Sequence, residues 1–319
     1  MSNAHYIKGL WLGLFGGILW GVDTVFIGLL LDQPLLDSSI FFAPLVITFL
    51  HDSFSSLWIL VYIIKQKYLS DLKNIIHNKT SLVIILAAFF GGPLGMAGYM
   101  MAIYYIGPSY TAIISATYPA VGAFLSVLFL KEKLTFKTGV GLSITIFSTM
   151  ALGFTSSESN TNLILGFFFA ALCAIGWGAE SVISAYGMRD NIIPVIALYL
   201  RQTTSAVIFA LIIIPLIDGY EIVKLIFSNS LVLYIFITAL AGTVSYLFYY
   251  TSINSIGPIK ATGLNISYSA WAILISLFLG FSVSLRELVL ACIIISGSLL
   301  TTNRPQDFFQ LLKFNRKVL

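Results

Sequence analysis

Residues 8–31 read KGLWLGLFGGILWGVDTVFIGLLL, and this stretch decides the fold class of the chain. It is as long as the roughly 20 apolar residues that a helix needs to cross the hydrocarbon core of a bilayer. The run is too long for the apolar region of a signal peptide, and it carries Trp20 and Asp23 within it. We therefore expect a membrane-spanning helix here.

Runs of the same kind recur along the whole chain. Hydrophobic residues make up 58% of the composition and charged residues only 9%, whereas soluble domains keep about a quarter of their residues charged. These charges are too few to cover a water-facing surface, so the sequence predicts an all-α polytopic membrane protein with ten transmembrane helices. The predicted spans are residues 8–31, 40–64, 80–105, 109–130, 134–153, 163–187, 192–215, 230–253, 258–281 and 285–302.

The Lys and Arg residues predict the orientation of the spans, because cytoplasmic loops carry an excess of both. Lys224 and Arg286 fall on the side opposite the N-terminus, and Arg201 falls within a span. Every other Lys and Arg falls on the N-terminal side, so we expect both termini in the cytoplasm. Segment 303–319 is expected to be a basic cytoplasmic tail that lies at the anionic surface of the membrane.

An offset of 150 residues aligns the two halves of the chain. Ile106-Gly107-Pro108 meets Ile256-Gly257-Pro258, and His51 meets Arg201. Such short matches are weak singly, but several of them in one register indicate an internal repeat.

The first and sixth predicted spans also match, at an offset of 157. Trp20-Gly21-Val22-Asp23 aligns with Trp177-Gly178-Ala179-Glu180. We expect a first five-helix repeat at 1–153 and a second at 154–302. Because each unit has an odd number of spans, the second is inserted upside down, as in many secondary transporters whose substrate site lies between the repeats.

The junction between the fourth and fifth spans resembles that of a known family. Leu130-Lys131-Glu132-Lys133-Leu134-Thr135, followed by Gly139 and Gly141, is similar to this junction in EamA-type transporters of the drug/metabolite transporter superfamily. The span number, short turns and inverted repeat agree over nearly the whole chain. The resemblance implies a multi-pass transporter of the bacterial plasma membrane. Segment 281–284 departs from the pattern because it lacks the glutamate, which puts that junction in doubt but not the fold.

Five ionisable residues fall well inside predicted spans, where a charge costs at least about 2.5–3.5 kcal/mol unless it is paired or hydrated. His51, Asp52 and Arg201 form either a structural polar network or a coupling or gating site for protons. Asp23 and Glu180 have no obvious cationic partner on their own spans. They are either acids near helix ends or symmetry-related acids that face a central cavity.

Aromatic residues accompany these acids. Tyr246, Tyr249 and Tyr250 share one helical face, and they form either an interfacial belt or a cavity wall. Aromatic faces next to carboxylates favour a cation that cannot form hydrogen bonds, such as a quaternary ammonium group. The candidate substrate-binding residues are Trp20, Asp23, Tyr99, Tyr118, Trp177, Glu180, Tyr246, Tyr249, Tyr250, Asn265 and Tyr268.

The Trp-Gly-x-Asp-Thr and Trp-Gly-x-Glu-Ser motifs that begin at Trp20 and Trp177 resemble those of bacterial choline permeases within this superfamily. This resemblance implies import of choline into an aromatic cage. Membrane potential alone can drive such import, and proton coupling through His51 and Asp52 remains open. The alternative is an exporter of amino acids or other small metabolites.

Other classes of protein find little support in the residues. The sequence has no nucleotide-binding loop, no metal-ligand spacing and no nucleophile–base motif, so we expect neither an enzyme nor a bound metal or cofactor. Cys173 and Cys292 both lie in apolar runs and indicate no disulfide framework. The expected partners are a small choline-like cation and the lipid bilayer, and not a nucleic acid.

Overall fold

The computed structural model describes residues 3–31, 33, 36, 42–76, 78–153, 162–190 and 192–302, and within them it contains helices and turns but no strand. The predicted tail at 303–319 lies outside the described residues. The helices are α1 (Asn3–Leu31), α2 (Ala43–Lys65), α3 (Leu69–Ile76), α4 (Lys79–Phe89), η2 (Phe90–Leu94), α5 (Gly95–Ser115), α6 (Tyr118–Leu125), η3 (Ser126–Leu130), α7 (Phe136–Gly153), α8 (Leu163–Gly187), η4 (Met188–Asp190), α9 (Pro194–Ile208), η5 (Phe209–Ile213), α10 (Ile214–Leu216), α11 (Tyr220–Phe227), α12 (Leu231–Ile256), α13 (Pro258–Asn265), α14 (Tyr268–Phe278) and α15 (Leu285–Leu300).

Eight helical segments of the described chain are long and apolar enough to cross a membrane. They coincide with eight of the ten predicted spans, which confirms a multi-pass, all-helical chain. The two remaining predicted spans, 134–153 and 285–302, are also helical, as α7 with 18 residues and α15 with 16 residues. Neither belongs to the eight, so the number ten remains a prediction.

The two Gly-Pro turns have nearly the same backbone geometry. Gly107 has φ 78° and ψ 166°, and Gly257 has φ 83° and ψ 158°. Positive φ is accessible to glycine without steric cost, so each glycine ends one helix and lets the next begin at once. Pro44 and Pro194, which the offset of 150 also pairs, each lie in the first turn of a helix, where proline is tolerated.

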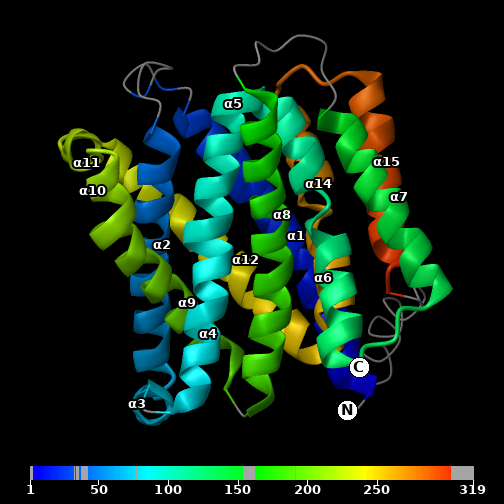
Figure 1. Ribbon diagram of the computed structural model, residues 1–319, viewed down its shortest axis with the longest axis horizontal. Helices are drawn as coiled ribbons and strands as arrows, with labels where there is room; N and C mark the ends of the chain where they lie inside the picture. The colour runs from blue at the N-terminus through cyan, green and yellow to red at the C-terminus, as the bar shows by residue number, and fades with distance from the viewer. Residues whose placement is uncertain are drawn as a thin grey trace, which may run out of the picture.

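The packing of the helices has the symmetry of the repeat. The α1 helix packs most extensively on α12, and α5 packs most extensively on α8. Because the repeat pairs α1 with α8 and α5 with α12, these two contacts are equivalent. Figure 1 shows that α1 rises from the lower end of the bundle whereas α8 descends to it, so the equivalent helices are antiparallel. We call the end where α1 begins the near end, and the opposite end the far end.

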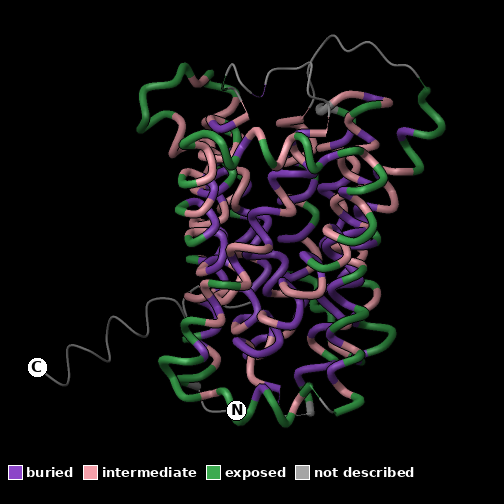
Figure 2. Tube along the Cα trace, turned by 90° about the vertical axis from the view of Figure 1, so that its left-hand side faces the viewer, coloured by how far each residue is buried: buried purple, intermediate pink, exposed green. Residues whose placement is uncertain are grey.

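Burial follows a pattern that suits a lipid environment. Buried residues concentrate along the axis of the bundle, whereas the outer faces of the helices are partly or fully exposed (Figure 2). Large apolar side chains lie on these outer faces, including Phe278 at 90% exposed and Phe136 at 88% exposed. In water such a surface would favour aggregation, whereas in a bilayer it is the surface that contacts lipid.

Candidate functional site

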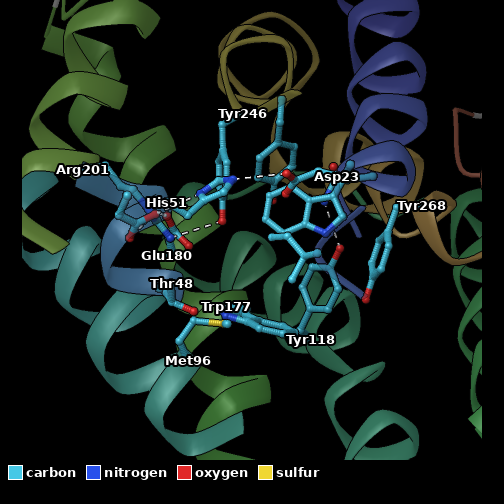
Figure 3. A pocket seen from close by; sticks show the side chains of 16 residues that line it. Asp23, Thr48, His51, Met96, Tyr118, Trp177, Glu180, Arg201, Tyr246 and Tyr268 are labelled. Atoms are coloured by element: carbon cyan, nitrogen blue, oxygen red, sulfur yellow. Dashed lines mark hydrogen bonds and ion pairs between the residues drawn. The ribbon is translucent and has the colours of Figure 1, made fainter. Parts of the chain in front are cut away.

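A cavity of about 130 Å³ lies between the two repeats, in the middle of the bundle. Figure 3 shows that side chains from both repeats converge on it. Helices α1, α2, η2, α5 and α6 contribute from the first repeat, and α8, α9, α12, α13 and α14 contribute from the second. The lining residues are Trp20, Asp23, Ile27, Thr48, His51, Asp52, Gly91, Met96, Tyr118, Trp177, Glu180, Arg201, Tyr246, Tyr249, Asn265 and Tyr268.

In the first repeat, the carboxylate of Asp23 pairs with His51. Asp23 Oδ1 on α1 lies 3.3 Å from His51 Nε2 on α2, and both side chains are buried. Gly242 of α12 packs directly on this pair, because a Cβ atom there would lie 2.5 Å from His51 Nε2. The second repeat therefore supports the imidazole of the first at a position that only glycine fits.

In the second repeat, Glu180 pairs with Arg201. Glu180 Oε1 on α8 accepts a hydrogen bond of 2.8 Å from Arg201 Nε on α9 and another of 3.0 Å from the buried hydroxyl of Tyr250. Since Asp23 aligns with Glu180 and His51 aligns with Arg201, the two acid–base pairs are equivalent under the repeat. The second pair carries a permanent positive charge, whereas the first carries a histidine.

Arg201 has partners on all sides. Its Nη1 donates to Asp52 Oδ2 at 3.1 Å and to Gln202 Oε1 at 2.6 Å, and its Nη2 donates to the hydroxyl of Tyr246 at 3.2 Å. Asp52 also lies 3.8 Å from His51, so one chain of charged groups runs from Asp23 to Glu180 across both repeats. Of the two predictions for His51, Asp52 and Arg201, the polar network is present, and it lies at the wall of the cavity.

The cavity has a surplus of negative charge. Asp23, Asp52 and Glu180 face one guanidinium group and one imidazole. With the carboxylates ionised, at least one negative charge remains whether His51 is neutral or protonated. The cationic partner of Glu180 comes from outside its own span, because Arg201 on the neighbouring helix α9 reaches it.

Aromatic rings form much of the remaining wall. The ring of Trp20 meets that of Tyr246 edge to face at 4.5 Å and that of Tyr268 at 6.1 Å. Trp177 meets Tyr118 at 5.9 Å with perpendicular planes. Such mutual contacts fix the orientation of the rings at the cavity wall.

One polar atom at the wall has no partner. Asn265 donates from Nδ2 to the hydroxyl of Tyr118 at 3.4 Å, but its buried Oδ1 accepts no hydrogen bond from any described residue. Most buried polar atoms in proteins are satisfied, so an orphaned acceptor at a cavity wall suggests that a ligand supplies the donor.

Nearly all of the sequence-predicted residues meet at this cavity. The exceptions are Tyr99, which lines a neighbouring cavity, and Tyr250, which is fully buried behind Glu180. An interfacial belt is excluded for Tyr249 and Tyr250, which are 7% and 0% exposed.

Four lining residues were not predicted from the sequence, namely Ile27, Thr48, Gly91 and Met96. Gly91 was recognisable in the sequence from the Gly-Gly-Pro run of the third span. The structure gives the reason for this glycine, because a Cβ atom there would overlap the carboxylate of Glu180. The other three gave no such signal.

A multi-pass helical chain with a charged, aromatic cavity between two inverted repeats defines a membrane transporter. The chain belongs to the EamA-like transporter family, which matches residues 7–154 and 164–303, one copy for each repeat. It is 30% identical to Protein LicB of Haemophilus influenzae over 269 residues, which cover 84% of this chain and 87% of that protein. The fold is also that of a solved crystal structure with 16% sequence identity and a TM-score of 0.67, over 93% of this chain and 97% of that chain.

Proposed function

We propose that this transporter imports choline or a related quaternary ammonium compound by alternating access. The proposal includes ten spans in two inverted units, 1–153 and 154–302, with both termini and the 303–319 tail in the cytoplasm. The similarity to LicB and the motifs shared with choline permeases support the choice of substrate. The observation that carries it is the combination, in one small cavity, of surplus negative charge with a wall of aromatic rings.

This combination suits a cation that has no hydrogen-bond donors at its charged centre. A trimethylammonium group binds to the faces of aromatic rings, and each desolvated contact of this kind contributes about 2 kcal/mol or more. The rings of Trp20, Trp177 and Tyr268 line the cavity, as does that of Tyr246, one face of which is covered by the guanidinium group of Arg201 at 4.8 Å. A primary ammonium group would instead seek several acceptors, which rings do not supply.

The size of the cavity and its orphaned acceptor favour choline in particular. Cavities of about 150 Å³ bind molecules as small as benzene. A cavity of about 130 Å³ thus matches a ligand of a few heavy atoms. Asn265 Oδ1 is the natural acceptor for the hydroxyl group of choline, because no described residue donates to it.

Asp23 is the carboxylate that balances the charge of the substrate. Glu180 is already neutralised by Arg201, to which it is bound directly. Among the described residues, the ionisable partner of Asp23 is His51, at the longer distance of 3.3 Å. When His51 is neutral, the charge of Asp23 remains free to attract a cation that sits against Trp20, which lies one helical turn away on α1.

The membrane potential can drive this import without a coupling ion. Moving one positive charge inward is favoured by about 2.3 kcal/mol per 100 mV of inside-negative potential, which corresponds to roughly fifty-fold accumulation. His51 and Asp52 offer a site for proton coupling in addition, at the same cavity wall.

Export of an amino acid is less compatible with the site. A zwitterion brings a carboxylate, which needs a cationic partner. The guanidinium group of Arg201 lines the cavity, but its donors are engaged by Glu180, Asp52, Gln202 and Tyr246. The substrate would have to displace one of these partners, and its carboxylate would meet the surplus negative charge.

A matched set of ligands tests the proposal on the purified protein. Choline should raise the unfolding temperature, and saturation at about 100-fold above the Kd corresponds to about 2.7 kcal/mol of stabilisation. The neutral carbon isostere of choline (dimethylbutanol), betaine, and an amino acid such as serine should have little effect. Equal stabilisation by choline and its neutral isostere would contradict the role of charge, and stabilisation by serine alone would favour the exporter.

A further inference from the structure

A second cavity, of about 240 Å³, adjoins the central one. It lies among α5, α6, α7, α8 and the junction of α13 with α14. Leu152 and Gly153, the last residues of α7, line it, and so does Ala112 on α5. Both segments belong to the far end of the bundle, where α7 ends and α8 begins (Figure 1). The second cavity therefore lies between the central cavity and the far end.

The two cavities share an aromatic wall. Tyr118, Trp177 and Tyr268 line both of them. On the side of the second cavity, the ring of Tyr99 stacks on Trp177 with centroids 5.5 Å apart and planes inclined by 30°. A molecule that moves from one cavity to the other thus stays in contact with aromatic rings, because the wall between the two cavities is aromatic and not aliphatic.

The second cavity favours a cation over an anion. Among its described lining residues, none is Lys, Arg, His, Asp or Glu. The hydroxyls of Ser115, Thr149 and Ser269 donate to carbonyl groups of their own helices, at 3.3, 2.9 and 3.1 Å. Their protons are therefore engaged, whereas their oxygen lone pairs remain. The cavity thus offers an anion no cationic side chain, whereas its aromatic faces suit a quaternary ammonium group, which needs no hydrogen-bond partner.

The opposite end of the central cavity is closed. A third cavity, of about 830 Å³, lies at the near end, and it shares no lining residue with the central one. Tyr249 lines the central cavity and Ile253 and Ile256 line the third, and all three belong to one buried apolar cluster. Among the described residues, the cavity that adjoins the central one therefore lies toward the far end and not the near end.

We propose that the second cavity is a relay site, which holds the quaternary ammonium substrate briefly on its way from the outer surface to the central cavity. This inference rests on the proposed function and on the cytoplasmic placement of the near end. Because the relay site has aromatic faces but no carboxylate, it binds the cation more weakly than the central cavity does. It speeds loading of the central site without contributing to its equilibrium affinity.

Stopped-flow tryptophan fluorescence tests this inference, since Trp177 lies in the shared wall. Choline is mixed with the purified parent and with the variants Ala112→Phe and Tyr99→Leu. Ala112→Phe fills the relay site, and it should slow association at least tenfold while the equilibrium Kd stays within twofold. Tyr99→Leu removes one aromatic face and should slow association several-fold. The matched control is Ala120→Phe, on an exposed position of α6, which should change neither quantity.

The outcomes are distinct. Association at the parent rate in both Ala112→Phe and Tyr99→Leu overturns the relay site and leaves the proposed function intact. If Ala112→Phe does not fold, Tyr99→Leu alone decides in the same way. If the parent binds no quaternary ammonium compound at all, the proposed function fails, and the relay site fails with it.

Discussion

The substitutions Glu180→Gln and Asp23→Asn should affect different properties of the protein. Glu180 accepts hydrogen bonds from Arg201 at 2.8 Å and from Tyr250 at 3.0 Å, whereas Asp23 makes a longer contact, of 3.3 Å, with His51. Removing one partner of a buried ion pair costs about 3–5 kcal/mol, because it leaves a charge uncompensated. Arg201 keeps Asp52, so we expect a loss near the lower limit, about 3 kcal/mol for Glu180→Gln.

Asp23→Asn should instead weaken binding. A unit charge about 4 Å from a cation contributes about 4 kcal/mol at an effective dielectric constant near 20. Relaxation of the site offsets part of this, so we expect choline to bind on the order of a hundredfold more weakly. Asparagine can still form a hydrogen bond with His51, so the loss of stability should be below about 1 kcal/mol.

Thermal unfolding without ligand and calorimetric titration with choline measure both effects. At roughly 2 °C per kcal/mol for a chain of this size, Glu180→Gln should unfold about 6 °C below the parent, and Asp23→Asn within about 2 °C of it. The reasoning is refuted if Glu180→Gln unfolds with the parent, or if Asp23→Asn binds choline as tightly as the parent does.

Three further predictions concern the junction at the near end of the bundle and the cavity. Gly257→Ala should destabilise the protein by more than about 1 kcal/mol, because φ is +83° and the added Cβ would overlap the carboxylate of Glu132. The control is Gly139→Ala, whose added Cβ would have no atom within 4 Å, and it should change thermal stability by less than about 0.5 kcal/mol. Burial raises the pKa of Glu132 above its unfolded value of 4.5, so ionisation of this carboxyl group opposes folding. Its contribution to stability is fully present below pH 4.5 and is lost as the pH rises through the pKa of the folded state. Unfolding temperatures measured from pH 4 upward should therefore fall more steeply in the parent than in Glu132→Gln, and parallel curves would contradict this. Tyr250→Phe should cost about 1.5–3 kcal/mol in a denaturation experiment, because it removes a hydrogen bond to the Glu180 carboxylate, and a neutral result would show that this bond does not matter.

Much of the fold was predictable from the sequence, because apolar length and the Gly-Pro turns act locally. The matched φ and ψ angles of Gly107 and Gly257 follow directly from the repeated Ile-Gly-Pro motif. The predicted span 285–302 agrees with α15 to within two residues, because polar residues follow the end of the helix at Leu300.

The pairing within the site was only partly predictable. The offset of 150 residues placed His51 and Arg201 at equivalent positions, but it did not show that each reaches the acid on the preceding span. That contact depends on the rotation of α9 against α8. Rotation is set by packing over many residues, so it is not encoded in any short motif.

The two misplaced tyrosines have separate physical causes. Tyr250 shares a helical face with Tyr246, but it lies one turn nearer to the near end, where Glu180 and Ser184 bind its hydroxyl. Tyr99 is separated from the central cavity by Trp177, against which it stacks. Helical periodicity gives the face of a residue but not the side chains that stand in front of it.

Uptake of labelled choline into proteoliposomes under an imposed potential tests the central claim most directly. We expect accumulation that depends on the protein, rises with inside-negative potential toward about fifty-fold at 100 mV, and is lost in Asp23→Asn. Flux no greater than in protein-free liposomes, or flux that ignores the potential and survives Asp23→Asn, would contradict the account.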